Sequence, residues 1–149
     1  MSKKFFTRIS LFVVVLATLV TATAMTASAA ETSDTALPSS YITYTGGANT
    51  TVRSKTNTTS VYMYNKSGMT LWVWANGGSK PGNPALYDAG TTIGGHANVM
   101  PGQYKVRTLI YEKGYRTAWL NITTATSGVA GNCSGLWSPD SIGSYPSAN

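Results

Sequence analysis

Two single residues are the first candidates for chemistry in this chain, the one cysteine, Cys133, and the one histidine, His96. A thiol and an imidazole can act as nucleophile and base if the fold brings them within hydrogen-bond reach. Because each type occurs once, the pair has no spacing that defines a motif. We expect a loop histidine and a small structural cysteine, and we keep a hydrolase that uses Cys133 and His96 as an alternative.

Carboxylates offer little more chemistry. Glycoside hydrolysis needs two of them at a set separation, and Glu31 and Asp34 fall in a segment that we expect to be disordered. The other acidic residues are Asp88, Glu112 and Asp140. No group of histidine, cysteine and carboxylate has metal-ligand spacing, and no Asp-x-Asp pattern indicates a calcium loop. We therefore predict a protein that is not an enzyme, with no catalytic residue, no metal and no cofactor.

Aromatic side chains give the strongest signal. Tyr62 and Tyr64 occupy alternate positions of one β-like run, and Trp72 and Trp74 do so in the next. Alternate residues of a strand share a face, and such rings offer apolar area with a polar rim. That surface suits stacking on sugars, and tryptophan also suits a membrane interface. We predict ligand binding by these four residues, with packing inside a two-layer sandwich as the alternative.

The first 29 residues have the features of a signal peptide. A positive region consists of Lys3, Lys4 and Arg8. Ile9–Val20 is almost wholly apolar, and Ala27–Ala29 has the small-x-small pattern that a signal peptidase recognises. The apolar run is shorter than the ~20 residues that a membrane-spanning helix needs. We predict that residues 1–29 are a signal peptide, cleaved after Ala29, and that the protein is secreted and extracellular.

The remaining chain has a small positive charge. Residues 30–149 carry eight lysines and arginines and five acids, a net charge of +3. This charge favours an anionic wall polymer or membrane surface, with Arg53, Lys55 and Lys66 adding attraction, and it is too weak and dispersed for nucleic acid. In a secreted protein, the lone Cys133 indicates either a free thiol or a bridge that links two copies.

The region after residue 40 has all-β texture, with runs of Thr, Val, Tyr and Trp broken by Gly, Asn and Pro. We predict a compact antiparallel β-sandwich of about six to eight strands over residues 41–140. A disordered lead-in at 30–40 precedes it, and a flexible tail at 141–149 follows. A long loop is expected over Asn76–Gly95, because that stretch is rich in glycine and proline.

Two β-hairpins are predicted inside this domain. In the first, Ser60–Asn65 pairs with Met69–Ala75 around Lys66–Gly68, which would set Tyr62 beside Trp72 on one face. The glycine that ends this turn occupies a position that requires positive φ.

In the second hairpin, Tyr104–Tyr111 pairs with Tyr115–Thr123 around Glu112–Gly114. That register opposes Arg107 to Trp119 and suits a cation–π contact.

A family resemblance accompanies these patterns. The stretch Arg53–Thr58, with the form Arg-x-Lys-Thr-Asn-Thr, precedes Val61-x-Met63, and Ser134–Trp137 follows near the end. This layout resembles the small secreted β-rich proteins of Bacillus and its relatives that are grouped under a domain of unknown function. The resemblance covers roughly Arg53–Asp140 and implies an extracellular β-sandwich, without implying an activity or a site.

We therefore expect a secreted, non-enzymatic protein that binds a surface through aromatic side chains. The expected partner is cell-wall glycan or another anionic surface polymer. The first alternative is a bacteriocin-like or membrane-active protein that meets membrane lipid with the same rings. The second is the hydrolase built on Cys133 and His96.

Overall fold

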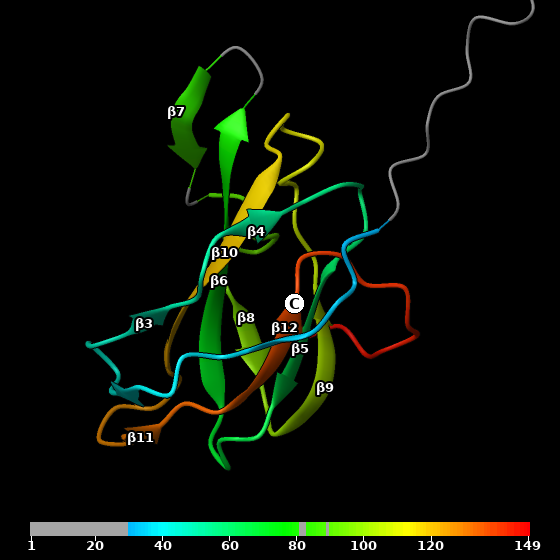
Figure 1. The fold of residues 1–149 in the computed structure, drawn as a ribbon. Helices are drawn as coiled ribbons and strands as arrows, with labels where there is room; N and C mark the ends of the chain where they lie inside the picture. Colours follow the sequence, from blue (N-terminus) through cyan, green and yellow to red (C-terminus); the bar gives the residue numbers. More distant parts are fainter. Residues whose placement is uncertain (1–29, 81–82, 89) are drawn as a thin grey trace, which may run out of the picture.

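A computed structural model describes residues 30–80, 83–88 and 90–149 (Figure 1). The predicted signal peptide, residues 1–29, lies outside the described residues. Every regular element in the described part of the chain is a β-strand, so the fold is all-β as predicted. A search of this part for a helix long and apolar enough to cross a membrane finds none.

The described strands form two main antiparallel sheets and one small one. The four-stranded sheet has the order β1 (Thr35–Ala36), β12 (Gly135–Ser138), β5 (Val61–Asn65) and β9 (Gly102–Val106). In the six-stranded sheet the long strands β6 (Leu71–Lys80) and β10 (Thr117–Thr124) are central neighbours. Four shorter strands flank this central pair: β3 (Ala48–Asn49) and β4 (Arg53–Ser54) pair with β10, and β7 (Asn83–Asp88) and β8 (Ala97–Val99) pair with β6. The small sheet consists of β11 (Gly131–Asn132) and β2 (Tyr41–Ile42).

Alternation on the central strands explains the sandwich. Leu71, Val73 and Ala75 of β6 have no exposed surface, and the residues between them lie on the outer face. Both main sheets turn their aliphatic rows inward, so the hydrophobic effect stabilises the stack of the two sheets. The fully buried row of β10 is Ala118, Leu120 and Ile122, and the four-stranded sheet contributes Val61, Met63, Val106 and Trp137.

The first predicted hairpin is wrong. The strand β5 pairs with β12 and β9, whereas β6 pairs with β10, β8 and β7, so the two strands belong to different sheets. Gly68 has the expected positive φ of 72°, but the connection crosses from one sheet to the other. Buried Asn65 holds this crossover, because its amide donates to the carbonyls of Met69 (2.8 Å) and Val99 (2.9 Å) and its oxygen accepts from Ser67.

The second hairpin is wrong for the same reason. The strand β9 belongs to the four-stranded sheet and β10 to the six-stranded sheet. Trp119 is paired with Asn76 rather than with Arg107. Gly114 has the expected positive φ of 88°, and the link between the strands buries Ile110 in the core. In both connections the turn residue suits a hairpin, but burial of two apolar rows against each other decides the pairing.

Three flanking segments also differ from the prediction. The lead-in is ordered in part, since β1 pairs with β12 and Leu37 packs in the core at 5% exposure. The tail lies against β9, where Ser147 bridges Lys105 and Ala148 packs on the core. The predicted loop at residues 76–95 begins with strand, because β6 runs on to Lys80 and β7 follows.

A buried ion pair joins distant parts of the chain. Lys55 follows β4 and Asp140 follows β12, and their side chains are 1% and 0% exposed. The Lys55 ammonium contacts Asp140 Oδ1, while Oδ2 accepts hydrogen bonds from the Glu31 N–H (2.8 Å) and the Thr56 hydroxyl (2.6 Å). This cluster therefore fastens the N-terminal segment and the end of β12 to the six-stranded sheet.

Candidate functional site

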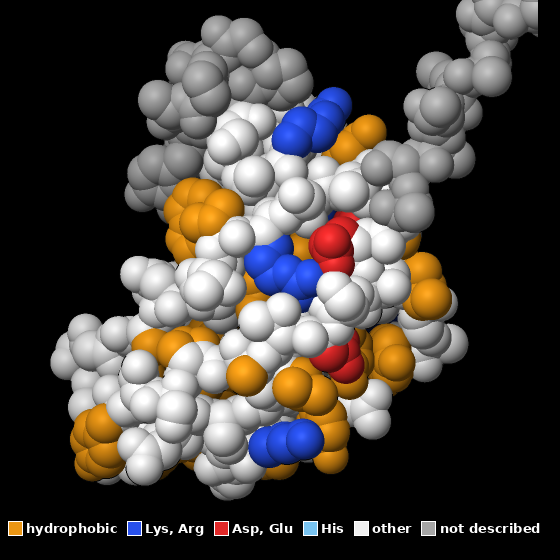
Figure 2. All heavy atoms as spheres, in the orientation of Figure 1, with side chains coloured by type: hydrophobic (Ala, Val, Ile, Leu, Met, Phe, Trp, Pro, Cys, Tyr) orange, Lys and Arg blue, Asp and Glu red, His pale blue; other side chains and the backbone are white. Residues whose placement is uncertain are grey.

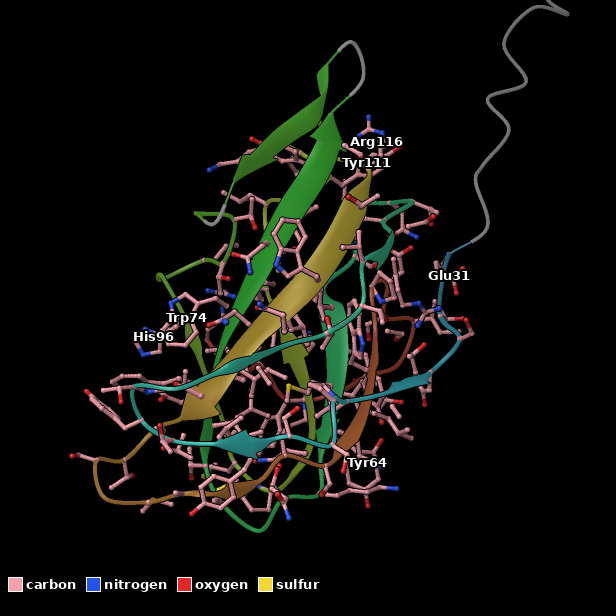
Figure 3. The ribbon with its side chains drawn as sticks, turned by 60° about the vertical axis from the view of Figure 1, so that its left-hand side comes forward. Glu31, Tyr64, Trp74, His96, Tyr111 and Arg116 are labelled. Atoms are coloured by element: carbon pink, nitrogen blue, oxygen red, sulfur yellow. The ribbon has the colours of Figure 1, made fainter. Side chains whose placement is uncertain are left out.

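The four aromatic residues predicted to form one face lie in two places. Tyr62 and Tyr64 are on β5, and Trp72 and Trp74 are on β6. The intervening residues of each strand point into the shared core, so the two aromatic rows face outward on opposite sides of the sandwich. Figure 3 shows Tyr64 and Trp74 on opposite sides of the molecule. The structure therefore assembles no single platform from these four rings.

Trp72 and Trp74 instead belong to a cluster with two rings from elsewhere in the chain. The Trp72 ring centroid lies 6.1 Å from that of Trp74 in an edge-to-face arrangement, 4.7 Å from His96 and 5.1 Å from Tyr44. The His96 and Trp74 centroids are 5.7 Å apart, and the two side chains lie side by side in Figure 3. We call these four residues the aromatic cluster.

The members of the aromatic cluster are only partly covered. Trp72, Trp74 and His96 are half-buried, and Tyr44 is 38% exposed. They rest on the outer face of the six-stranded sheet, supported from behind by the buried residues of β6. The outer face of this sheet thus carries two partly exposed indoles, and both are positioned by a strand rather than by a loop.

Side-chain amides surround the aromatic cluster. The β-sheet register sets Asn121 beside Trp74 and Asn98 beside Trp72, and cross-strand partners share one face of a sheet. The Asn121 amide donates to Asn49 Oδ1 at 2.9 Å, which extends the polar row to the edge strand β3. The same face therefore combines ring surface with hydrogen-bond donors and acceptors.

The other two predicted site residues are less available. Tyr62 is 7% exposed, its hydroxyl donates to Gln103 Oε1 at 3.0 Å, and its ring centroid lies 4.7 Å from that of Tyr145. Burial raises the pKa of Tyr62. Tyr64 is half-buried, with the Lys66 ammonium 4.7 Å from its ring centroid.

Cys133 and His96 take separate roles. Cys133 is fully buried in the core, and burial raises the pKa of its thiol to about 11. Because the thiolate is the nucleophilic form, very little of it is present at neutral pH. His96 contacts the two indoles of the aromatic cluster. A bridge between two copies through Cys133 would require the core to open.

Two of the three cations predicted to attract an anionic polymer form ion pairs within the protein instead. Lys55 is buried against Asp140, and Arg53 pairs with Glu31 at 2.6 Å. Lys66 remains exposed. On the face in Figure 2 the charged side chains lie scattered among neutral ones. Among the described residues, no group of three or more His, Cys, Asp or Glu side chains is placed to hold a metal ion.

Sequence reasoning missed Tyr44 and His96 as partners of the tryptophans. The strand β8, which begins one residue after His96, lies just beyond the stretch that we expected to be loop. Its alternation of Ala97, Asn98 and Val99 is a three-residue signal, too short to assign on periodicity. The contact of His96 with the tryptophans follows from the pairing of β8 with β6, which no local pattern encodes.

Fold and surface together define an all-β sandwich that carries an aromatic cluster on one outer sheet face. The chain belongs to the family described as Protein of unknown function (DUF2712), whose model matches residues 25–141. This match agrees with the expected resemblance to an uncharacterised family. No curated protein and no solved structure matches the chain.

Proposed function

We propose that this protein is secreted and binds a polysaccharide without catalysis, through the aromatic cluster and its neighbouring amides. Cell-wall glycan is the partner that we expect. The observation that carries the proposal is the placement of Trp72 and Trp74, half-buried and side by side on a rigid outer face.

The chemistry of a sugar matches this face. A pyranose ring has apolar C–H surfaces and a rim of hydroxyl groups, so it pairs with rings that offer flat apolar area and with amides beside them. The Trp74–Asn121–Asn49 row and the Trp72–Asn98 pair provide both kinds of partner. The edge-to-face angle of 86° between the two indoles presents surfaces in two orientations, which suits a chain of sugars better than a flat crystalline array.

The test measures binding of the purified protein to Gram-positive cell walls by sedimentation, with tryptophan fluorescence as a second signal. We expect Trp74→Ala to weaken binding at least about tenfold, which corresponds to about 1.4 kcal/mol. Tyr41→Ala is the matched control, because Tyr41 is 69% exposed and lies outside the aromatic cluster. Thermal unfolding of both variants must match the parent protein. Equal binding by Trp74→Ala and the parent would contradict the proposal.

Two further measurements separate the alternatives. A membrane-active protein would sediment with anionic liposomes and release their contents, because tryptophan also favours the membrane interface. A hydrolase that depends on Cys133 would lose activity in Cys133→Ser without losing its fold. The burial of Cys133 and its raised thiol pKa favour the non-catalytic proposal.

A further inference from the structure

A hollow lies on the opposite side of the sandwich from the aromatic cluster. It has a volume of about 170 Å³ and lies between the N-terminal segment, the outer face of β5 and the C-terminal tail. Tyr62 contributes its floor, and its other principal lining residues are Thr32, Asp34, Ser141, Ile142 and Tyr145. With about 30 Å³ for each water molecule in the liquid, the hollow has room for a small organic group.

Two tyrosine rings form its aromatic wall. The Tyr62 and Tyr145 centroids are 4.7 Å apart at an interplanar angle of 41°. Tyr145 can fold back in this way because residue 143 is glycine: a Cβ there would lie 2.2 Å from a carbon of the Tyr145 ring. The hydrogen bond from Tyr62 to Gln103 fixes the other ring. The wall is thus held from both sides.

Polar groups without partners and a net negative charge characterise the hollow. Asp34 is exposed, and within the part of the chain that the structure describes its carboxylate has no hydrogen bond or ion pair. Ser141 also lines the hollow, and its hydroxyl oxygen is buried without a partner among the described residues. Asp140 also lines the hollow, but the ammonium of Lys55 neutralises its charge. The net charge of this lining is therefore negative.

We propose that this hollow binds a primary ammonium group carried on a small organic molecule or on a polymer. The ammonium donates hydrogen bonds to the Asp34 carboxylate, and it lies against the electron-rich faces of Tyr62 and Tyr145. A compact, strongly hydrated cation with three donors suits an exposed carboxylate that has no ion-pair partner. The exposed Ile142 at the rim, at 79%, can cover the alkyl part of the ligand.

The probe is n-propylammonium, titrated into the purified protein and followed by backbone amide NMR shifts. We expect saturable shifts at residues around the hollow, and at least a tenfold weaker affinity in Asp34→Asn. Glu112→Gln is the matched control, because Glu112 is an exposed acid that does not line the hollow, and it should bind as the parent does. Propanol, which has a similar shape without the charge, should bind far more weakly, and tetramethylammonium, which has no donors, should fall between.

Three results would overturn the proposal: no saturable shifts at millimolar probe, equal affinity of Asp34→Asn and the parent, or equal affinity for propanol. Asp34→Asn should fold as the parent does, because Asp34 is exposed and its carboxylate has no hydrogen bond or ion pair among the described residues. Trp74→Ala should leave propylammonium binding unchanged, since the two surfaces lie on opposite faces. A negative result with propylammonium therefore does not contradict the proposed polysaccharide site, and a negative result with cell walls does not contradict the ammonium site.

Discussion

Replacing Asp140 by alanine tests how much the buried Lys55–Asp140 ion pair stabilises the fold. The substitution removes the partner of Lys55, whose side chain is 1% exposed and would keep only the carbonyl of Thr59, at 2.5 Å, as an acceptor. It also strips the Glu31 N–H and the Thr56 hydroxyl of their common acceptor. Breaking a buried ion pair on one side typically costs about 3–5 kcal/mol, a large share of the roughly 5–15 kcal/mol that stabilises a domain.

The assay is urea unfolding at neutral pH, followed by tryptophan fluorescence. We expect the free energy of unfolding to fall by about 3–5 kcal/mol in Asp140→Ala. The control is the double substitution Lys55→Met with Asp140→Leu, because replacing both charges by apolar groups of similar volume is often neutral. The double variant should therefore be more stable than Asp140→Ala. A loss below about 1 kcal/mol, or a double variant no better than the single one, would refute the reasoning.

The lowered pKa of Asp140 also predicts that the stability of the fold depends on pH. Burial alone would raise the pKa of Asp140, but the hydrogen bonds from Lys55 and Thr56 and from the backbone of Glu31 hold it below its ordinary value. A carboxyl whose pKa is lower in the folded than in the unfolded state adds stability above the unfolded pKa of about 3.9. That stability is lost as the pH falls through the folded value, so the parent should weaken more steeply in acid than Asp140→Ala.

Two further substitutions and one thiol-labelling experiment test the packing of other parts of the fold. Leu37→Ala should cost about 2–5 kcal/mol in urea unfolding because the side chain is buried; a disordered lead-in would show no loss. Gly77→Ala should cost about 1–3 kcal/mol, since a Cβ there would lie 2.8 Å from the ring of Tyr115, and unchanged stability would contradict that close approach. Cys133 should react with a thiol reagent only in denaturant, because it is buried and its pKa is raised to about 11; rapid labelling of the folded protein would show an open core.

The strand composition was predictable because it depends on local physics. Short runs of β-branched and aromatic residues between glycines and prolines favour extended backbone, and the chain folds into strands of that kind. Of the twelve strands in the described residues, seven have three or more residues, against the six to eight expected. The five two-residue strands are too short to leave a periodic signal. The positive φ of Gly68 and Gly114 was also predictable, because glycine adopts it without steric cost.

Strand pairing was not predictable from the same patterns. A tight turn between β5 and β6 favours a hairpin locally, yet both strands gain more by burying Met63 and Val73 inside a two-layer core. The alternation that separates inward from outward residues is identical for neighbours in one sheet and for strands in facing sheets. The inward row of β6 was therefore identified correctly, while the partner of β6 was not.

The sequence by itself determined an all-β chain with aliphatic rows on one side of its strands and aromatic rows on the other, because alternation and turn chemistry act over a few residues. Only the tertiary structure decided which rings meet. His96 meets Trp72 because β8 pairs with β6, and Tyr44 meets the same ring from the segment between β2 and β3. Lys55 meets Asp140 across 85 residues. Such contacts depend on the burial of the whole core, which is a property of all the strands together and of no single segment.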